Sequence, residues 1–245
     1  MSVAAVTLAP KTWTELAPTS AVKAALRGSV TTKVISAPLL PTRGATLTAC
    51  SKGDYRTQWE GFARALADAG IASPVLDLGD PGAATQPEAF AACYRQVAAA
   101  VRGVLPKARM QWTVDRTAMN PSSPRGAGGP TSPTDLMVAW PGDGVVDILG
   151  IDSLDTGDNW SKTVNGEGGL NWWSDFASDR KARIALSGWG PAPGSAASAG
   201  NGAYVQNVHD WLSRMARRGL LAYDLYSEPS ASRGGSAANV YRALF

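Results

Sequence analysis

The chain of 245 residues is poor in the residue types on which most metal and nucleophile sites depend. It has two cysteines, one histidine and five glutamates. Cys50 and Cys93 are far too distant in sequence for a CxxC pair, and one histidine cannot complete a zinc site with them, so a structural zinc ion is excluded. We expect both cysteines to be buried and reduced, and the protein to need no metal and no other cofactor.

Serine hydrolases and phosphate-binding loops also lack their signatures here. No GxSxG segment occurs, and the single histidine, His209, falls on a predicted helix, which argues against a Ser-His-Asp triad. The glycine-rich segment 126–129 has no following lysine and serine or threonine, so it does not predict a phosphate-binding loop. We interpret His209 as a solvated surface residue.

Long apolar runs and one-sided charge are absent as well. No stretch approaches the roughly 20 apolar residues of a membrane span, and the first ten residues lack the basic start and apolar run of a secretion signal. We therefore expect a protein made in the cytoplasm without a signal peptide and not inserted into a membrane. The net charge is only +3 and the basic residues are scattered, which predicts no nucleic-acid partner.

The chain is rich in short apolar runs that alternate with amphipathic helical patterns, the order typical of βα units around a parallel sheet. The predicted strands cover residues 32–40, 74–78, 110–114, 145–151, 183–186 and 220–225, with a weaker one at 3–8. Apolar helical stripes lie between them, at 59–69, 90–101 and 204–215. Breaker-rich loops follow strands at 120–133, 190–202 and 227–236, as on the functional face of a βα barrel. We predict one α/β domain over 1–245, a (β/α)8 TIM-type barrel whose degenerate N-terminal portion, 1–31, leaves its first βα unit incomplete.

Several segments, taken in order, resemble glycoside hydrolase family 26, the β-mannanase-like retaining glycosidases on a (β/α)8 barrel. The segments are 35–41, 75–80, 111–115, 140–155, 183–190 and 241–245. The longest match is Trp140-Pro141-Gly142-Asp143 continuing through Val146-Asp147-Ile148-Leu149-Gly150-Ile151-Asp152, which resembles the family's sixth strand. The resemblance covers about residues 35–245 and implies the barrel fold, with carbohydrate bound at the carboxyl ends of the strands.

The departures from the family fall on its catalytic residues. Leu186-Ser187-Gly188-Trp189-Gly190 resembles the strand end at which the family carries Ser-Glu-Trp-Gly, and Gly188 replaces the nucleophilic glutamate. At the acid/base position an ungapped comparison places Pro81, next to Asp80. Retaining hydrolysis needs two carboxyl groups about 5 to 5.5 Å apart. The resemblance therefore predicts no catalytic residue, and a pseudoenzyme.

Sugar recognition remains open to the other side chains near the predicted strand ends. Tryptophan rings commonly stack on sugars, and they also pack well in protein cores. Trp189 is therefore interpreted either as a sugar-stacking surface or as part of the packing. Trp160 is interpreted either as a sugar-stacking surface or as an anchor for its own loop. The predicted substrate-binding residues are Trp160, Trp189, Asp80, Asp115 and Asp152. Asp224, Glu167 and Glu228 are further carboxylates that follow strands and could face the same end.

Three functions follow from the resemblance. The first is a non-catalytic, structural or glycan-recognition subunit, which the resemblance associates with phage virions as a minor tail or tail-tip protein. Its partners would be a cell-envelope or other polysaccharide, and other virion subunits or a second copy that covers the strand edges left by the incomplete barrel. The second is a working retaining β-glycanase that uses Asp80 with Glu228 or Asp224, and the third is a purely architectural subunit.

Overall fold

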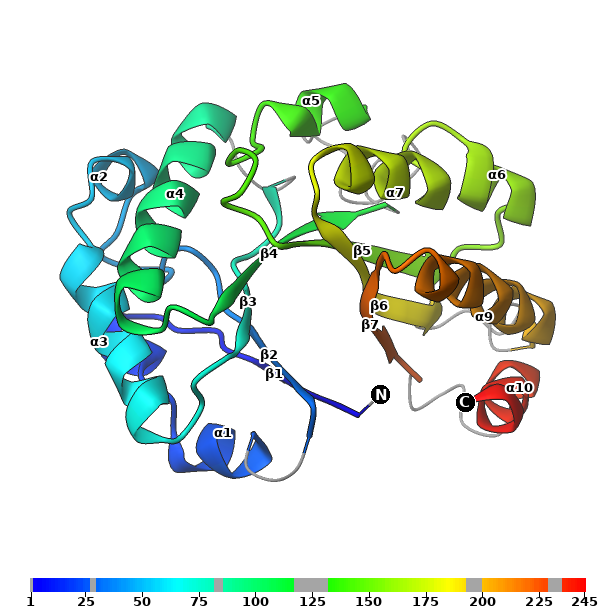
Figure 1. Ribbon diagram of the computed structural model, residues 1–245, viewed down its shortest axis with the longest axis horizontal. Helices are drawn as coiled ribbons and strands as arrows, with labels where there is room; N and C mark the ends of the chain where they lie inside the picture. Colours follow the sequence, from blue (N-terminus) through cyan, green and yellow to red (C-terminus); the bar gives the residue numbers. More distant parts are fainter. Residues whose placement is uncertain (1, 27–29, 82–85, 117–131, 193–199, 229–234) are drawn as a thin grey trace. The chain divides into compact units, whose positions relative to one another are not determined.

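The computed structural model describes residues 2–26, 30–81, 86–116, 132–192, 200–228 and 235–245 (Figure 1). They belong to two compact units, one of Met1–Thr113 with Thr134–Ile148 and one of Val114–Pro133 with Leu149–Phe245. Within the described residues seven strands alternate with helices and follow one another in the order β1 to β7. This is the order of a TIM-type (β/α) barrel and confirms the predicted fold class.

The first unit holds the N-terminal strands, which pair in parallel. Ala5, Val34 and Val75 are register partners across the first three strands. The elements are β1 (Val3–Thr7), η1 (Trp13–Leu16), α1 (Ser20–Ala25), β2 (Thr32–Ser36), α2 (Leu47–Ser51), α3 (Arg56–Asp68), β3 (Val75–Asp77), α4 (Pro87–Val104), β4 (Arg109–Asp115), which ends in the second unit, and α5 (Pro133–Met137). The weak strand predicted at 3–8 therefore exists, and β2 ends before Pro38, which cannot donate a backbone hydrogen bond.

The amphipathic patterns of the sequence explain how the helices of this unit pack. On α3 the buried residues are Trp59, Phe62, Ala63 and Leu66, which follow the predicted stripe. Helix α4 begins with Pro87 at its first turn, where the missing N–H group costs nothing, and buries the predicted face that includes Tyr94. These faces pack with buried strand residues such as Val75, Leu76 and Met110 to form the apolar core of the unit.

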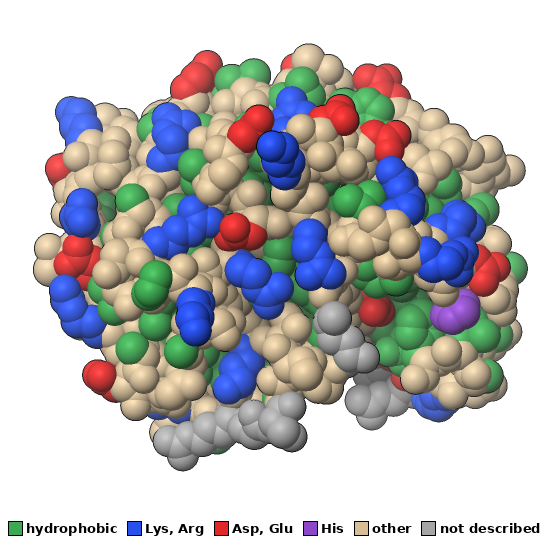
Figure 2. Space-filling model, viewed as in Figure 1, with side chains coloured by type: hydrophobic (Ala, Val, Ile, Leu, Met, Phe, Trp, Pro, Cys, Tyr) green, Lys and Arg blue, Asp and Glu red, His purple; other side chains and the backbone are tan. Residues whose placement is uncertain are grey.

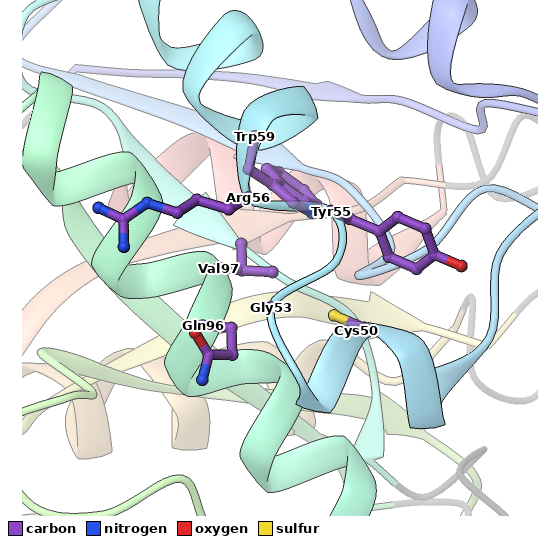
Figure 3. Close-up of a pocket in the computed structure, with 7 residues that line it drawn as sticks. All are labelled: Cys50, Gly53, Tyr55, Arg56, Trp59, Gln96 and Val97. Carbon is purple, nitrogen blue, oxygen red and sulfur yellow. The ribbon is translucent and has the colours of Figure 1, made fainter.

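A disulfide joins Cys50 of α2 to Cys93 of α4, so the prediction of reduced cysteines is wrong. Their burial was predicted correctly, since both side chains are 1% exposed or less. The sequence separation of 43 residues hides the pair, and it forms because α2 packs on α4 and brings the two Cα atoms within 4.9 Å. The turn after α2 packs on α4 in the same region, with Gly53 at φ +90° facing Gln96 (Figure 3).

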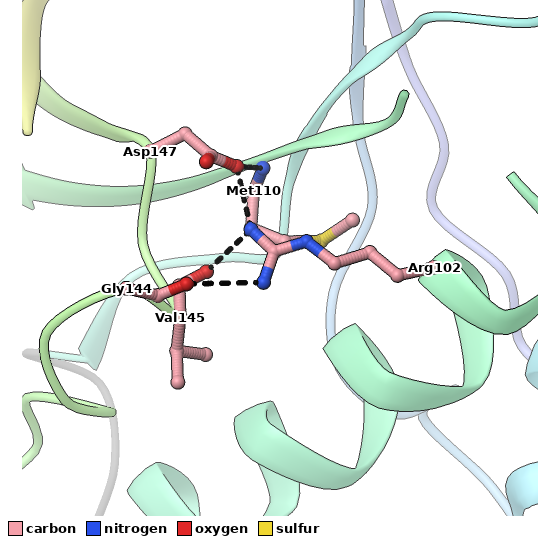
Figure 4. Close-up of polar contacts among 5 residues, drawn as sticks. All are labelled: Arg102, Met110, Gly144, Val145 and Asp147. Carbon is pink, nitrogen blue, oxygen red and sulfur yellow. Dashed lines mark hydrogen bonds and ion pairs between the residues drawn. The ribbon is translucent and has the colours of Figure 1, made fainter. Parts of the chain in front are cut away.

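One guanidinium group fixes the approach to the fifth strand (Figure 4). Arg102 of α4 donates to the carbonyl oxygens of Gly144 and Val145 at 3.3 and 2.9 Å and to Oδ2 of Asp147 at 2.7 Å. The same carboxylate oxygen accepts the N–H of Met110 at 2.6 Å. These contacts hold residues 144–147 in a turn, and the strand predicted from 145 therefore starts at Ile148 instead.

The second unit holds the C-terminal strands and their helices. Its elements are β5 (Ile148–Asp155), α6 (Trp160–Asn165), α7 (Leu170–Asp179), β6 (Arg183–Pro191), α9 (Gly202–Arg217), β7 (Leu221–Tyr226) and α10 (Ser236–Leu244). Strands β6 and β7 pair in parallel, and Leu186 and Trp189 are register partners of Asp224 and Tyr226. Strand β6 runs five residues beyond its predicted end, so the Ser-Gly-Trp-Gly segment is part of the strand rather than of a loop.

The described residues hold neither a candidate membrane span nor a candidate metal site. None of the helices in these ranges combines the length and apolar content that a membrane crossing requires, and no three His, Cys, Asp or Glu side chains in them come together as a metal-binding group. Figure 2 shows one face of the molecule, on which Lys and Arg side chains are spread between acidic ones rather than gathered in a single patch.

Candidate functional site

The neighbouring strands β5 and β6 place the Asp152 carboxylate beside Gly188, each residue lying three positions before the last residue of its strand. Oδ1 of Asp152 would lie 3.0 Å from a Cβ atom at Gly188, and it accepts a hydrogen bond from the Ser187 hydroxyl at 2.7 Å. A side chain at Gly188 would therefore begin against a carboxylate. The structure brings the predicted residue Asp152 to the strand end at which the sequence lacks a glutamate.

Trp189, the next residue of β6, is fully buried and bonded to Asp224. Its exposed fraction is 0%, and its Nε1 donates to Oδ2 of Asp224 at 3.1 Å. Burial raises the pKa of the Asp224 carboxyl, against which the Trp189 hydrogen bond acts. A ring with no exposed face offers no surface on which a sugar can stack, so of its two interpretations the structure favours packing. The residue after Trp189 must be glycine for the backbone to pass here, because a Cβ atom at Gly190 would lie 2.3 Å from the Ser227 carbonyl oxygen.

Aromatic rings from β7 and α10 pack on the buried indole of Trp189. Tyr226 stacks on Tyr241 with ring centroids 3.9 Å apart, and Tyr241 stacks on Phe245 at 4.7 Å. Trp189 meets Tyr226 edge-on at 5.0 Å. Phe245 is 53% exposed, so the outer end of this aromatic stack lies at the surface. The rings of Phe245 and His209 are perpendicular with centroids 5.1 Å apart, and His209 is only half-buried.

The end of β5 is tied to the start of α9 beside the second predicted platform, Trp160. Asp155 accepts hydrogen bonds from Gly157 N–H and from the side-chain amide of Asn201, whose oxygen caps α9. The hydroxyl of Tyr204 donates to the Ser153 carbonyl at 2.5 Å. Trp160, half-buried at the first position of α6, meets Tyr204 edge-on at 6.0 Å. Unlike Trp189, this indole keeps part of its surface in solvent.

The first unit has its own cluster at the ends of β2, β3 and β4, around a carboxyl group that the sequence analysis did not select. Asp77 accepts hydrogen bonds from the hydroxyls of Ser36 at 3.1 Å and Thr113 at 2.8 Å, and Gln111 donates to Thr113. Burial raises the pKa of Asp77 from 3.8 to about 6, although these hydroxyls and the Gly79 N–H lower it. The available signal was one carboxylate inside the apolar run of β3.

The other predicted residues are more dispersed. Asp80 follows β3 and Asp115 ends β4, each half-buried, while Pro81 is buried. Among the alternative carboxylates, Glu228 pairs with Arg242 at 3.4 Å. Glu167 is exposed. Most of the loop predicted at 120–133 lies outside the described residues.

The chemistry of each cluster follows from these contacts. In the second unit, Asp152 and Asp224 are acceptors already engaged by Ser187 and Trp189, and the same unit carries the partly exposed rings of Trp160 and Phe245. Carboxylates next to aromatic faces suit neutral polyhydroxylated ligands, whose hydroxyls donate and whose C–H faces stack. In the first unit, burial raises the pKa of Asp77 to about 6, which brings its titration closer to neutral pH than that of an ordinary carboxyl group.

No protein-family model and no curated protein matches the sequence. Solved structures resemble the chain more clearly. A modular endo-β-1,4-mannanase of glycoside hydrolase family 26 from Cellulomonas fimi superimposes with a TM-score of 0.58 and 17% identity, over 87% of this chain and 53% of that chain. An exo-β-1,4-mannosidase from an Opitutaceae bacterium superimposes with a TM-score of 0.61 and 15% identity, over 100% of this chain and 53% of that chain.

A family 1 β-glucosidase from Thermotoga maritima gives a TM-score of 0.58 and 9% identity, over 100% of this chain and 82% of that chain. The chain spans about half the length of the mannanase and mannosidase structures. At these identities the likeness concerns the fold. The chain has the TIM-type (β/α) barrel fold of these glycosidases.

Proposed function

We propose that the chain binds a neutral glycan at the ends of β5, β6 and β7 and does not cleave it by the retaining mechanism. The observation that carries the proposal is the pair Gly188 and Asp152. A double displacement requires a carboxylate that attacks the anomeric carbon, and at this strand end the residue is glycine. The carboxylate beside it, Asp152, comes from another strand and is bound to the Ser187 hydroxyl.

The carbohydrate part of the proposal is supported by the fold and by the surface around these strand ends. The similar structures include an endo-β-1,4-mannanase, an exo-β-1,4-mannosidase and β-1,4-galactanases. Trp160, half-buried at the start of α6, and Phe245, 53% exposed after α10, are aromatic side chains that keep surface in solvent. Asp152 and Asp224 give acceptors for sugar hydroxyls.

Binding is tested by calorimetric titration with β-1,4-linked manno-oligosaccharides, gluco-oligosaccharides and bacterial envelope polysaccharide. We expect at least one of them to bind, and Trp160→Ala to weaken that binding about tenfold, a loss of about 1.4 kcal/mol. Trp172→Ala is the matched control, because Trp172 is also half-buried but stacks on Phe176 in α7. No binding to any of these glycans, or an equal loss in both variants, would refute glycan recognition at this site.

Cleavage is tested in the same preparations by the release of reducing ends. We expect none above the buffer rate from the wild-type chain. Release that disappears in Asp80→Asn, Asp152→Asn or Asp224→Asn would overturn the non-catalytic proposal and identify the carboxyl group that acts.

The second candidate function is a working hydrolase, and the raised pKa values of Asp77 and Asp224 favour it. A carboxyl group that keeps its proton to higher pH is what a general acid needs. In that case cleavage would follow a bell-shaped pH profile, and Asp77→Asn would remove the limb that Asp77 controls. With Asp224 as the acid, the remaining carboxylate for the nucleophile is Glu228, which is paired with Arg242 at 3.4 Å.

The setting of the protein, as a minor tail or tail-tip subunit of a phage virion with other subunits or a second copy as partners, stays a prediction. The disulfide supports work outside a reducing cytoplasm, since such bonds persist in oxidising surroundings. Mass spectrometry of purified virions or of secreted fractions, under thiol-blocking conditions, would locate the chain. Recovery only from the cytosol in the reduced form would contradict this setting.

A further inference from the structure

A cavity lies in the first unit, between η1 and α3. Its volume is about 200 Å³. Its lining residues are Trp13, Thr14, Leu16, Ala17, Gln58, Gly61 and Phe62. None of these side chains is charged, so the cavity suits a neutral guest rather than a phosphate, a carboxylate or an amine.

The walls of the cavity are carbon and its rim is polar. Trp13 packs against Tyr55 and Trp59, with ring centroids 4.8 and 6.4 Å away, and its Nε1 is buried with no acceptor among the described residues. The part of this indole that remains exposed is therefore carbon surface. Phe62 adds a second ring. Gln58 and Thr14 are exposed lining residues with an amide and a hydroxyl, and the Thr14 hydroxyl lies 2.8 Å from that of Thr12.

Gly61 is the residue that the fold itself does not explain. It lies inside α3, where glycine costs roughly 0.5 to 1 kcal/mol relative to alanine. Its φ is not positive, and a Cβ atom added there would have nothing within 4 Å. No turn or close approach in the described residues requires glycine at this position, and its effect is to leave the side of the cavity without a side chain.

We propose that this cavity is a binding site for a single neutral sugar ring, separate from the glycan site at the strand ends. A cavity of about 150 Å³ holds one benzene molecule, so 200 Å³ has room for one six-membered ring with substituents. The carbon walls match the C–H face of a pyranose, and the amide and hydroxyl at the rim match its hydroxyl groups.

The test is an NMR titration of the disulfide-bonded protein with mannose, glucose and galactose, following the Trp13 indole and Gln58 amide signals. We expect saturable shifts with at least one sugar. Gly61→Leu, which fills the cavity and improves helix propensity, should abolish them. The matched control is Gly103→Leu in α4, another helical glycine whose added Cβ would meet nothing within 4 Å and which does not line the cavity.

Further outcomes separate this site from the strand ends and from other guests. Trp160→Ala should leave the Trp13 shifts unchanged. Gln58→Ala should weaken the affinity measured from the Trp13 shifts at least threefold without altering the fold. The proposal is overturned if no sugar shifts these signals, if Gly61→Leu binds as well as Gly103→Leu, or if benzene or indole binds where sugars do not. Loss of the Trp13 shifts in Trp160→Ala would assign them to the strand-end site and overturn the separate one.

Discussion

Oδ1 of Asp152 lies 3.0 Å from the point that a Cβ atom of residue 188 would occupy. Glycine at 188 and a carboxylate at 152 therefore fit one another, because the two positions share one small volume. A side chain introduced at 188 forces the carboxylate to move by some tenths of an ångström.

This relationship predicts the effect of filling position 188. Gly188→Ala should lower the free energy of unfolding by about 1 to 2 kcal/mol, the usual cost of overpacking, and Asp152→Ala in the same chain should recover part of the loss. Urea unfolding of the two single variants and the double variant gives the coupling. Gly103→Ala is the control and should stabilise by roughly 0.5 to 1 kcal/mol. Equal effects at 188 and 103 would contradict the shared volume.

The same relationship predicts that Gly188→Glu alone does not produce a glycosidase. The new carboxyl group begins beside Asp152, and two like charges at close range raise each other's pKa and displace each other. We expect no release of reducing ends from Gly188→Glu on any substrate that the wild-type chain binds. Comparison with Gly188→Glu/Asp152→Asn shows whether the Asp152 charge alone prevents activity. Cleavage by the single variant would disprove this prediction.

The Asp77 carboxyl predicts a pH dependence of stability. Its pKa is raised to about 6 in the folded chain, above the ordinary value of 3.8, so the folded state holds the proton to higher pH than the unfolded state does. Its contribution is therefore fully present below about pH 4 and is lost as the pH rises to about 6, a change on the order of 3 kcal/mol. Asp77→Asn should remove this fall, measured as the difference in unfolding free energy between pH 4 and pH 7.

A carboxylate of opposite behaviour serves as the control for that measurement. The Arg56 guanidinium hydrogen-bonded to Glu60 lowers the pKa of that exposed carboxyl. Its contribution is present above pH 4.5 and is lost as the pH falls, so Glu60→Gln should change the profile with the opposite sign. If Asp77→Asn and Glu60→Gln shift the profile in the same direction, the assignment to Asp77 is wrong.

The disulfide predicts a large dependence of stability on redox conditions. Closing the loop between Cys50 and Cys93, 43 residues apart, is worth about 4 kcal/mol on the chain-entropy account. We expect the midpoint of urea unfolding to fall when a strong reductant is present, and Cys50→Ser/Cys93→Ser to show the lower midpoint in either condition. An unchanged midpoint after complete reduction, checked by thiol counting, would argue against a stabilising bond.

The Arg102 guanidinium predicts a difference between arginine and lysine. It contacts the Gly144 and Val145 carbonyls and the Asp147 carboxylate together, and a lysine ammonium cannot span these acceptors. Arg102→Lys should lower the unfolding free energy by about 1 to 2 kcal/mol. Arg56→Lys, in an exposed pair with Glu60, is the matched control and should change it by less than about 0.5 kcal/mol.

The alternation of strands and helices could be predicted from the sequence because each pattern is local. The buried runs at β3 and β4 and the stripe on α3 are read from neighbours a few residues apart. The start of β5 could not be predicted in this way, because it depends on the contacts of Arg102, which lies more than 40 residues away in the sequence. The pairing of Cys50 with Cys93 was missed for the same reason, because only the packing of α2 on α4 brings them together.

The candidate site was predicted unevenly. The strand-end position of Gly188 and Asp152 follows from the order of motifs, and the structure adds that the two are neighbours. The packing of Trp189 depends on Tyr226, Tyr241 and Phe245, three rings from elsewhere in the chain. The protonation of Asp77 depends on burial by elements that the strand pattern does not specify.

The covalent link between α2 and α4 has a practical consequence for every comparison of variants. Protein produced in a reducing cell would contain molecules with and without the bond, and the two forms would melt separately. A biphasic curve from such a sample would imitate an intermediate, although each form unfolded in one step. Air oxidation followed by separation of the two species must therefore precede any ranking of the substitutions above.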